Sequence, residues 1–166
     1  VVVYQVGEHD GRVFLAMEHV PGGTARTWLR AKPRTWRAIV ALFAAAGDGL
    51  AAAHAAGLIH RDFKPDNLLV GDDDRPRVAD FGLVRTILGD QPEDESTTGA
   101  AGSTRAGTIV GTPAYMPIEQ LRGEAVDARA DQFAFCASLW EALHGARPFA
   151  GETPAELRES IESAPP

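Results

Sequence analysis

A short, charged segment limits the possible folds of this chain more than any other feature of its sequence. Residues 60–67 read His-Arg-Asp-Phe-Lys-Pro-Asp-Asn, so acids, bases and an amide share one turn-sized stretch. A long helical pattern precedes this segment, and a short apolar run at residues 68–70 follows it. The sequence therefore predicts a polar loop fixed between a helix and a short strand.

The helical pattern before the loop spans residues 35–56. Thr35 is suited to cap its first turn, and Gly57 to end it in the left-handed conformation. We predict that one face of this helix is buried and that its histidine is a packed or helix-end residue rather than a metal ligand. The predicted face consists of Trp36, Ile39, Val40, Phe43, Gly47, Leu50 and His54.

Short strands are predicted on both sides of this helix and loop. Residues 1–6 and 12–20 are rich in β-branched and aromatic side chains, and the Asp-Gly pair between them is a hairpin signal. Residues 68–71 and 76–79 form a second predicted pair around three consecutive aspartates. These aspartates indicate a solvated turn, because the spacing of a calcium-binding EF-hand is absent. Asp80-Phe81-Gly82 follows directly.

The second half of the chain changes from polar to helical. Residues 83–109 contain mostly Gly, Ser, Thr, Asp and Glu, and we predict that this segment is mobile. The apolar stretch 131–143 predicts a buried central helix, with Cys136 as an inert core thiol. Thr153 is suited to cap a last helix over residues 154–163, which begins with Pro154.

Length and composition limit the classes of function. The 166 residues make one ordinary domain or part of a larger one, and the net charge of -7 argues against a general nucleic-acid binder. The single cysteine excludes a disulfide framework and a cysteine-cluster metal site. No signal peptide or membrane-spanning stretch is expected, which favours the cytoplasm. We expect the chain to be a piece of a longer polypeptide, so a membrane anchor in the full-length protein stays open.

Three segments together resemble those of a known family. The segments 60–67, 80–82 and 111–116 (Gly-Thr-Pro-Ala-Tyr-Met) resemble, in order and spacing, the catalytic loop, metal motif and docking loop of bacterial eukaryotic-type (Hanks-type) serine/threonine protein kinases. The resemblance implies an α+β, protein-kinase-like fold, mostly the helical large lobe plus the last hairpin of the small lobe. Residues 1–20 would form the hairpin and hinge, 21–166 an incomplete large lobe, and about 80–119 the activation segment.

The resemblance also implies a site for phosphoryl transfer from ATP. Asp62 would accept or orient the proton of the incoming hydroxyl, and Lys64 would neutralise the γ-phosphate. Asn67 and Asp80 offer the oxygen ligands that Mg²⁺ prefers, with Mn²⁺ as an alternative ion. Protein substrates are implied, with serine or threonine as the acceptor, because Lys64 and the docking residue Thr112 are features of that branch of the family.

Further residues follow from the same resemblance. The adenine ring would lie against Met17 and Leu69 and would bond to the backbone of Glu18 and Val20. Asp131 would hold the backbone of the catalytic loop, although an acid in the first turn of a helix is also favoured by the helix dipole.

Regulation by phosphorylation is a further implication. Arg61 before the catalytic aspartate marks the RD type, in which a phosphorylated activation segment pairs with the arginine. Thr104 and Thr108 are the first candidates for that modification, and the weaker ones are Ser96, Thr97, Thr98 and Ser103.

Some parts of such an enzyme are missing from these residues. The Gly-rich loop, the strand lysine that grips the phosphates and its helix glutamate are absent. We therefore expect little or no kinase activity from this chain alone. Two alternatives stay open: a pseudokinase or scaffold that binds partners, and, ranked last, a small-molecule phosphotransferase of the aminoglycoside or choline type.

Overall fold

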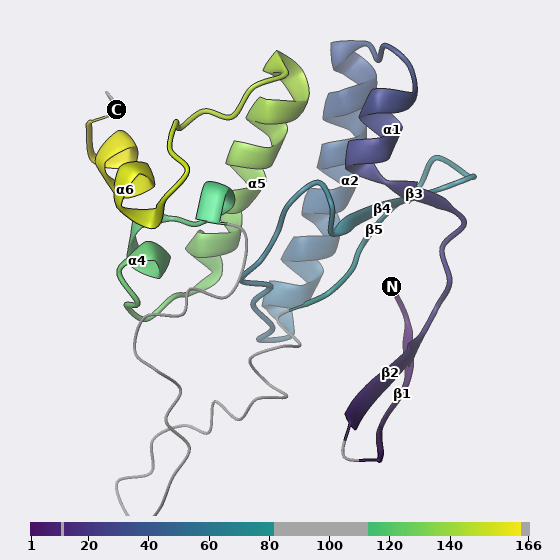
Figure 1. The fold of residues 1–166 in the computed structure, drawn as a ribbon. Helices are drawn as coiled ribbons and strands as arrows, with labels where there is room; N and C mark the ends of the chain where they lie inside the picture. The colour runs from purple at the N-terminus through teal and green to yellow at the C-terminus, as the bar shows by residue number, and fades with distance from the viewer. Residues whose placement is uncertain (11, 82–112, 164–166) are drawn as a thin grey trace, which may run out of the picture.

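The structure is a computed structural model that describes residues 1–10, 12–81 and 113–163 (Figure 1). The predicted mobile segment, 83–109, lies outside the described residues. In chain order the elements are β1 (Val3–His9), β2 (Arg12–Met17), β3 (Gly22–Thr24), α1 (Ala25–Ala31), α2 (Trp36–Ala55), β4 (Leu68–Gly71), β5 (Pro76–Val78), the 3-10 helix η1 (Pro113–Tyr115), α4 (Ile118–Leu121), α5 (Ala128–His144) and α6 (Pro154–Ser163).

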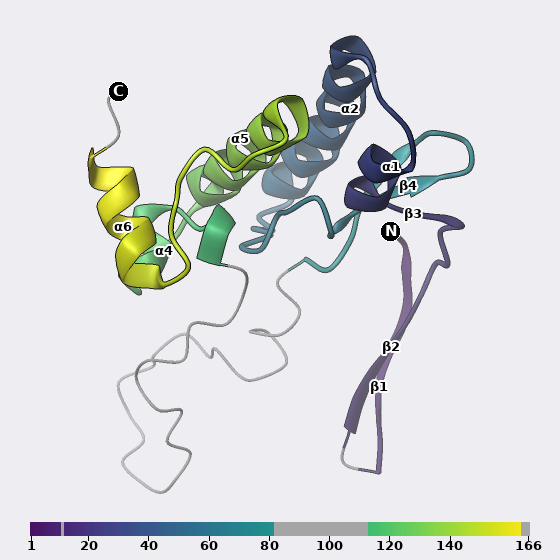
Figure 2. The ribbon, with the colours of Figure 1, turned by 45° about the horizontal axis from the view of Figure 1, so that its top comes forward.

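The first two strands form the predicted antiparallel hairpin, in which Val6 lies opposite Leu15. The second strand ends at Met17 rather than at residue 20. The hairpin extends away from the helices (Figure 2). Its contacts with the rest of the chain include the backbone nitrogen of Val1, which donates to the carbonyl of Val78 at 3.1 Å, and an ion pair of 3.4 Å between Glu18 and Arg77.

A second sheet lies beside the helices in the order β3-β4-β5, with all strands antiparallel. The β4-β5 pair around the three aspartates is confirmed. The sequence carries no strand signal where β3 forms, because Pro21, Gly22 and Gly23 favour a break in regular structure. Gly22 has φ of +121°, and a Cβ atom there would lie 2.3 Å from the carbonyl oxygen of Val70. Only glycine permits this close pairing.

Helix α2 has the predicted ends. Thr35 Oγ1 accepts from the amide of Ala38 at 3.2 Å, and Gly57 has φ of +78°. The predicted buried face is only partly right, because Trp36 and Val40 are exposed. Trp36 lies in the first turn, beyond the core, and Val40 lies beside the stripe of buried residues. That stripe consists of Ile39, Leu42, Phe43, Ala46 and Leu50.

No stretch with the length and composition of a membrane span was expected from the sequence, and α2 differs from that expectation. This helix of 20 residues is long and apolar enough to cross a bilayer. Its buried stripe, however, contacts α5 and β5. The core helix of a folded domain has the same length and composition, so this property does not show a membrane span.

Helix α5 is longer than predicted and is buried on one face only. It begins after the cap Asp127 and ends at Gly145, whose φ is +75°. Cys136 is exposed, as are Trp140 and Leu143, so the prediction of an inert core thiol was wrong. An apolar run cannot indicate which face of a helix is covered. The last helix, α6, has the predicted bounds, with Thr153 Oγ1 accepting from the amide of Glu156 at 3.2 Å.

The core that supports the polar loop lies between α2 and α5. Phe135 of α5 packs against Phe43 of α2 and against Phe63 of the loop, with ring centroids 5.7 Å apart in each pair. Phe63 is fully buried. One aromatic side chain of the loop therefore anchors it to both long helices, while its charged neighbours Asp62 and Lys64 are half-buried.

Candidate active site

A buried carboxylate fixes the beginning of the loop. Asp131 of α5 accepts the backbone amide of His60 through Oδ2 and that of Arg61 through Oδ1, both at 2.7 Å. His54 of α2 also contacts Oδ2 at 2.7 Å. Asp131 therefore holds the loop backbone as predicted, and it also lies in the first turn of α5. Histidine 54 is confirmed as a packed helix-end residue.

His60 links this loop to the next motif. Its Nε2 donates to the carbonyl of Ala79 at 2.8 Å, and its Nδ1 accepts the amide of Asp62 at 3.3 Å. These partners require a neutral ring with its proton on Nε2. Burial lowers the pKa of His60, which keeps the ring neutral. Sequence reasoning gave this histidine no role of its own.

Three predicted catalytic residues come together in the loop. The ammonium of Lys64 lies 2.6 Å from Oδ2 of Asp62. The side-chain amide of Asn67 donates to the backbone carbonyl of Asp62 at 2.8 Å and to its Oδ2 at 3.2 Å. The two contacts with the carboxylate of Asp62 both use Oδ2, so Oδ1 is the oxygen suited to meet an incoming hydroxyl.

Asp80 is brought to the same edge by the β4-β5 pair. The amide of Ala79 donates to the carbonyl of Asn67 at 2.9 Å, which continues the pairing of Leu68 with Val78. Asp80 follows Ala79, is exposed, and has φ of +60°. The strand pair thus sets Ala79, the residue directly before Asp80, beside Asn67.

The donor atoms at this edge fit a magnesium ion that is shared with a phosphate ligand. Asn67 bonds to Asp62 through its amide nitrogen, so its side-chain oxygen is the atom that could serve as a hard ligand, and Asp80 adds an exposed carboxylate. In the part of the chain that the structure describes, no three His, Cys, Asp or Glu side chains cluster as a metal site. The protein would thus supply only a few of the ligands of the ion, which is usual where Mg²⁺ is also bound by the phosphates of a substrate.

The predicted adenine residues are separate from the loop. Met17 ends β2, and Glu18 and Val20 follow it, whereas Leu69 lies half-buried in β4. The amide of Glu18 donates to the carbonyl of Val2 at 2.8 Å.

The predicted docking and regulatory residues lie mostly outside the described residues. These are Thr112, Thr104, Thr108 and the weaker candidates Ser96, Thr97, Thr98 and Ser103. Arg61 is described: its φ is +66°, and its carbonyl accepts from Nε2 of Gln120 at 2.8 Å.

Sequence reasoning missed a second group of charged side chains beside the loop. Arg26 of α1 lies 2.9 Å from Asp66 of the loop and also bonds to Tyr115 and Glu141. The last of these is 115 positions away along the chain. No local pattern signals such a group, because only the folded chain brings its members together.

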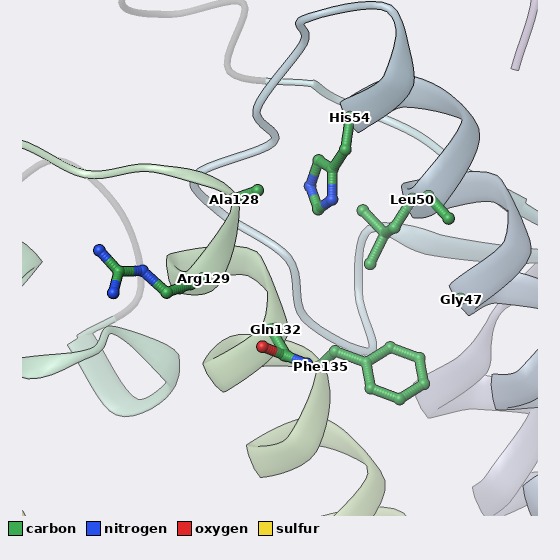
Figure 3. Close-up of a pocket in the computed structure, with 8 residues that line it drawn as sticks. Gly47, Leu50, His54, Ala128, Arg129, Gln132 and Phe135 are labelled. Atoms are coloured by element: carbon green, nitrogen blue, oxygen red, sulfur yellow. The ribbon is translucent and has the colours of Figure 1, made fainter.

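A pocket of about 330 Å³ lies in the seam between α2 and α5 (Figure 3). Its lining includes Leu50, His54, Arg129 and Phe135 and none of the predicted catalytic or nucleotide-binding residues. The candidate site is therefore identified by its converging polar groups and not by the shape of this hollow.

Comparisons with known proteins agree with the arrangement. Residues 1–164 match the family model described as "Protein kinase domain". The "Serine/threonine-protein kinase PknL" of Mycobacterium tuberculosis is 41% identical over 154 residues, which cover 92% of this chain and 36% of that protein. The "Serine/threonine-protein kinase PknJ" of Mycobacterium bovis is 35% identical, and PknB of M. tuberculosis is 33% identical. Those matches cover 100% and 95% of this chain but 28% and 24% of the relatives.

Proposed function

The chain belongs to the protein kinase domain family, as a bacterial Hanks-type serine/threonine kinase domain, and from that premise we propose that the full-length protein phosphorylates serine or threonine residues of proteins. The observation that carries the proposal is the arrangement of Asp62, Lys64 and Asn67 on a loop held by Asp131. The chain covers 36% of the length of PknL and 28% of the length of PknJ. The activity of the whole protein is therefore part of this proposal.

The chemistry assigned to the loop is transfer of the γ-phosphoryl group of ATP. The substrate hydroxyl oxygen forms a new bond to phosphorus, the bond to the ADP oxygen breaks, and the hydroxyl proton passes toward Asp62. Lys64 remains paired with Asp62 at 2.6 Å and offsets the negative charge that gathers on the transferring group. Positioning and charge therefore account for the catalysis.

Nucleotide binding is assigned to both ends of the site. Asn67 and Asp80 would hold Mg²⁺, or Mn²⁺ in its place, and the bound ion would neutralise phosphate charge. The adenine would contact Met17 and Leu69 and bond to the backbone of Glu18 and Val20. Because the ATP of a cell is in its cytoplasm, we assign the domain to that compartment, whether or not the full-length protein has a membrane anchor.

We assign an activation switch to Arg61. Its backbone is fixed on both sides, by Asp131 and by Gln120, which sets the start of its side chain. A phosphate on Thr104 or Thr108 would form charge-assisted hydrogen bonds with the guanidinium and order the segment that carries Thr112.

The first experiment compares the full-length protein with its Asp62→Asn variant. We expect Mg²⁺- and ATP-dependent labelling of casein on serine or threonine, and a loss of about 100-fold or more in the variant, because general-base catalysis contributes on that order. Asp72→Asn, in the exposed turn after β4, is the matched control and should keep the activity. An unchanged Asp62→Asn rate would refute the proposal, and ATP binding without any transfer would favour the scaffold.

The 166-residue chain should transfer little or no phosphate in the same assay. These residues supply Lys64, Asn67 and Asp80 but neither a Gly-rich loop nor a strand lysine for the phosphates. Labelling by this chain at the rate of the full-length protein would contradict the expectation. The Asp62→Asn variant of the same chain measures the background labelling.

A further inference from the structure

Four polar side chains from four parts of the chain form a compact group, which we call the Arg26 cluster. Its members are Arg26 of α1, Asp66 of the catalytic loop, Tyr115 of η1 and Glu141 of α5. None of them belongs to the predicted catalytic set. The cluster therefore needs an explanation of its own.

The guanidinium of Arg26 is the centre of the cluster. Its Nε donates to the carboxylate of Asp66 at 2.9 Å, its Nη1 to Oε1 of Glu141 at 3.2 Å, and its Nη2 to the hydroxyl of Tyr115 at 2.6 Å. The Tyr115 hydroxyl in turn donates to Oε2 of Glu141 at 2.5 Å. Three separate N–H groups of one rigid plane are used, which a lysine ammonium cannot reproduce.

The cluster is partly withdrawn from water, and its one positive charge lies between two carboxylates, of which that of Asp66 stays 44% exposed. The side chains of Arg26 and Glu141 are 22% and 18% exposed. Burial alone would lower the pKa of Arg26, but the hydrogen bonds to its partners raise it overall. Burial and the bond to Glu141 raise the pKa of Tyr115, so its hydroxyl keeps the proton that it donates.

The cluster also touches the two segments that must act together in phosphoryl transfer to a protein. Asp66 directly precedes the metal residue Asn67, and the backbone amide of Arg26 donates to the carbonyl of Pro65 at 3.3 Å. Tyr115 lies three residues after Thr112, in the segment assigned to peptide docking. One guanidinium thus joins the catalytic loop to the docking segment, while Glu141 ties both to α5.

We propose that Arg26 is a positioning residue that fixes the docking segment relative to the catalytic loop, so that the acceptor hydroxyl reaches Asp62. The inference rests on the proposed kinase function. Arg26 touches no reacting atom and acts through Asp66 and Tyr115. Its loss would let the two segments move independently, and small misplacements of a bound substrate reduce rates strongly.

The test measures two Michaelis constants in the full-length protein, one for a serine/threonine peptide and one for ATP. We expect Arg26→Lys and Tyr115→Phe to lower kcat/KM for the peptide about tenfold or more and to leave KM for ATP within about twofold. Tyr115→Phe keeps the ring and removes both hydroxyl bonds. Arg30→Ala, an exposed arginine of the same helix, is the matched control and should change neither constant.

The outcomes separate the inference from its alternatives. A lower melting temperature with unchanged peptide kinetics would show a purely structural role and overturn the inference, as would equal losses for peptide and ATP. If Arg26→Lys does not fold, the kinetics of Tyr115→Phe provide the test, because that variant keeps the packing of the aromatic ring. An inactive wild-type protein would overturn the proposed function itself, whereas active wild type with unchanged variants would overturn only the positioning role.

Discussion

At the scale of single residues, the site is built on backbone conformations that need support. Arg61 and Asp80 have φ of +66° and +60°, in the left-handed region where residues other than glycine are uncommon. Each such conformation costs on the order of 1 kcal/mol or more. Asp131 and Gln120 hold the first, and the bond from His60 to Ala79 holds the peptide just before the second. A neutral buried histidine therefore helps to set the backbone that leads into Asp80, the proposed metal ligand.

The protonation of His60 should make stability depend on pH. Burial lowers its pKa in the folded state, so the unfolded chain binds the proton first as pH falls below about 6.5. The stabilisation is therefore complete above about pH 6.5 and is lost as pH falls toward the folded pKa. We expect the free energy of unfolding in urea to decrease between pH 7.5 and 5.5, by at most about 1.4 kcal/mol per pH unit from this group.

His60→Gln is the informative variant because its amide can still donate to Ala79 but does not titrate. Its unfolding free energy should change less with pH than that of the wild type. His9→Gln, at an exposed position of β1, should keep the wild-type slope. Equal slopes for the wild type and His60→Gln would show that His60 carries no pH dependence.

At the scale of elements, local signals and tertiary contacts can be separated. Caps and glycine ends are local chemistry, and they predicted the bounds of α2 and α6 from Thr35, Gly57 and Thr153. Strand β3 was missed because its stability comes from pairing with β4 rather than from its own residues. The exposure of one side of α5, which includes Cys136, was not predicted. The sequence shows that the helix is apolar, but it does not show which of its faces are covered by neighbouring elements.

Helix α5 should lose its hold on the catalytic loop when Asp131 is replaced by asparagine. Asp131 accepts three hydrogen bonds with both oxygens, and the variant would turn an N–H group toward one of these donors. Because unsatisfied buried donors are costly, we expect a loss on the order of 3 kcal/mol in the free energy of unfolding, measured in urea. Asp48→Asn, on the exposed side of α2, is the control and should stay within about 0.5 kcal/mol. A similar small change in Asp131→Asn would contradict this account of the loop.

At the scale of the whole molecule, the sequence predicted the grouping of the candidate catalytic residues far better than the side chains that surround them. Asp62, Lys64 and Asn67 lie within six positions, so a single loop conformation brings them together. The Arg26 cluster depends instead on how α1, η1 and α5 pack around that loop, and nothing near Arg26 in the sequence indicates its partners. Long-range charge groups of this kind come only from the tertiary structure.

The β1-β2 hairpin has an open edge through which two copies of this chain could associate in solution. Strand β1 carries the exposed side chains of Val3, Tyr4 and Val6, and within the described ranges it pairs only with β2. An open strand edge with apolar side chains can pair with a second copy, and a lysine on such an edge opposes this. We expect this chain to associate in a concentration-dependent way in sedimentation velocity, and we expect Val6→Lys to reduce that association.

Leu58→Lys provides a matched control, because Leu58 is 57% exposed and Val6 is 59% exposed. Leu58 follows α2 and lies on no strand, so its replacement removes equal apolar exposure without changing a sheet edge. If both variants reduce association equally, general surface hydrophobicity is the cause. If only Val6→Lys does so, the hairpin edge is the surface by which these chains associate, and covering it would be the first requirement for a monomeric form of this domain.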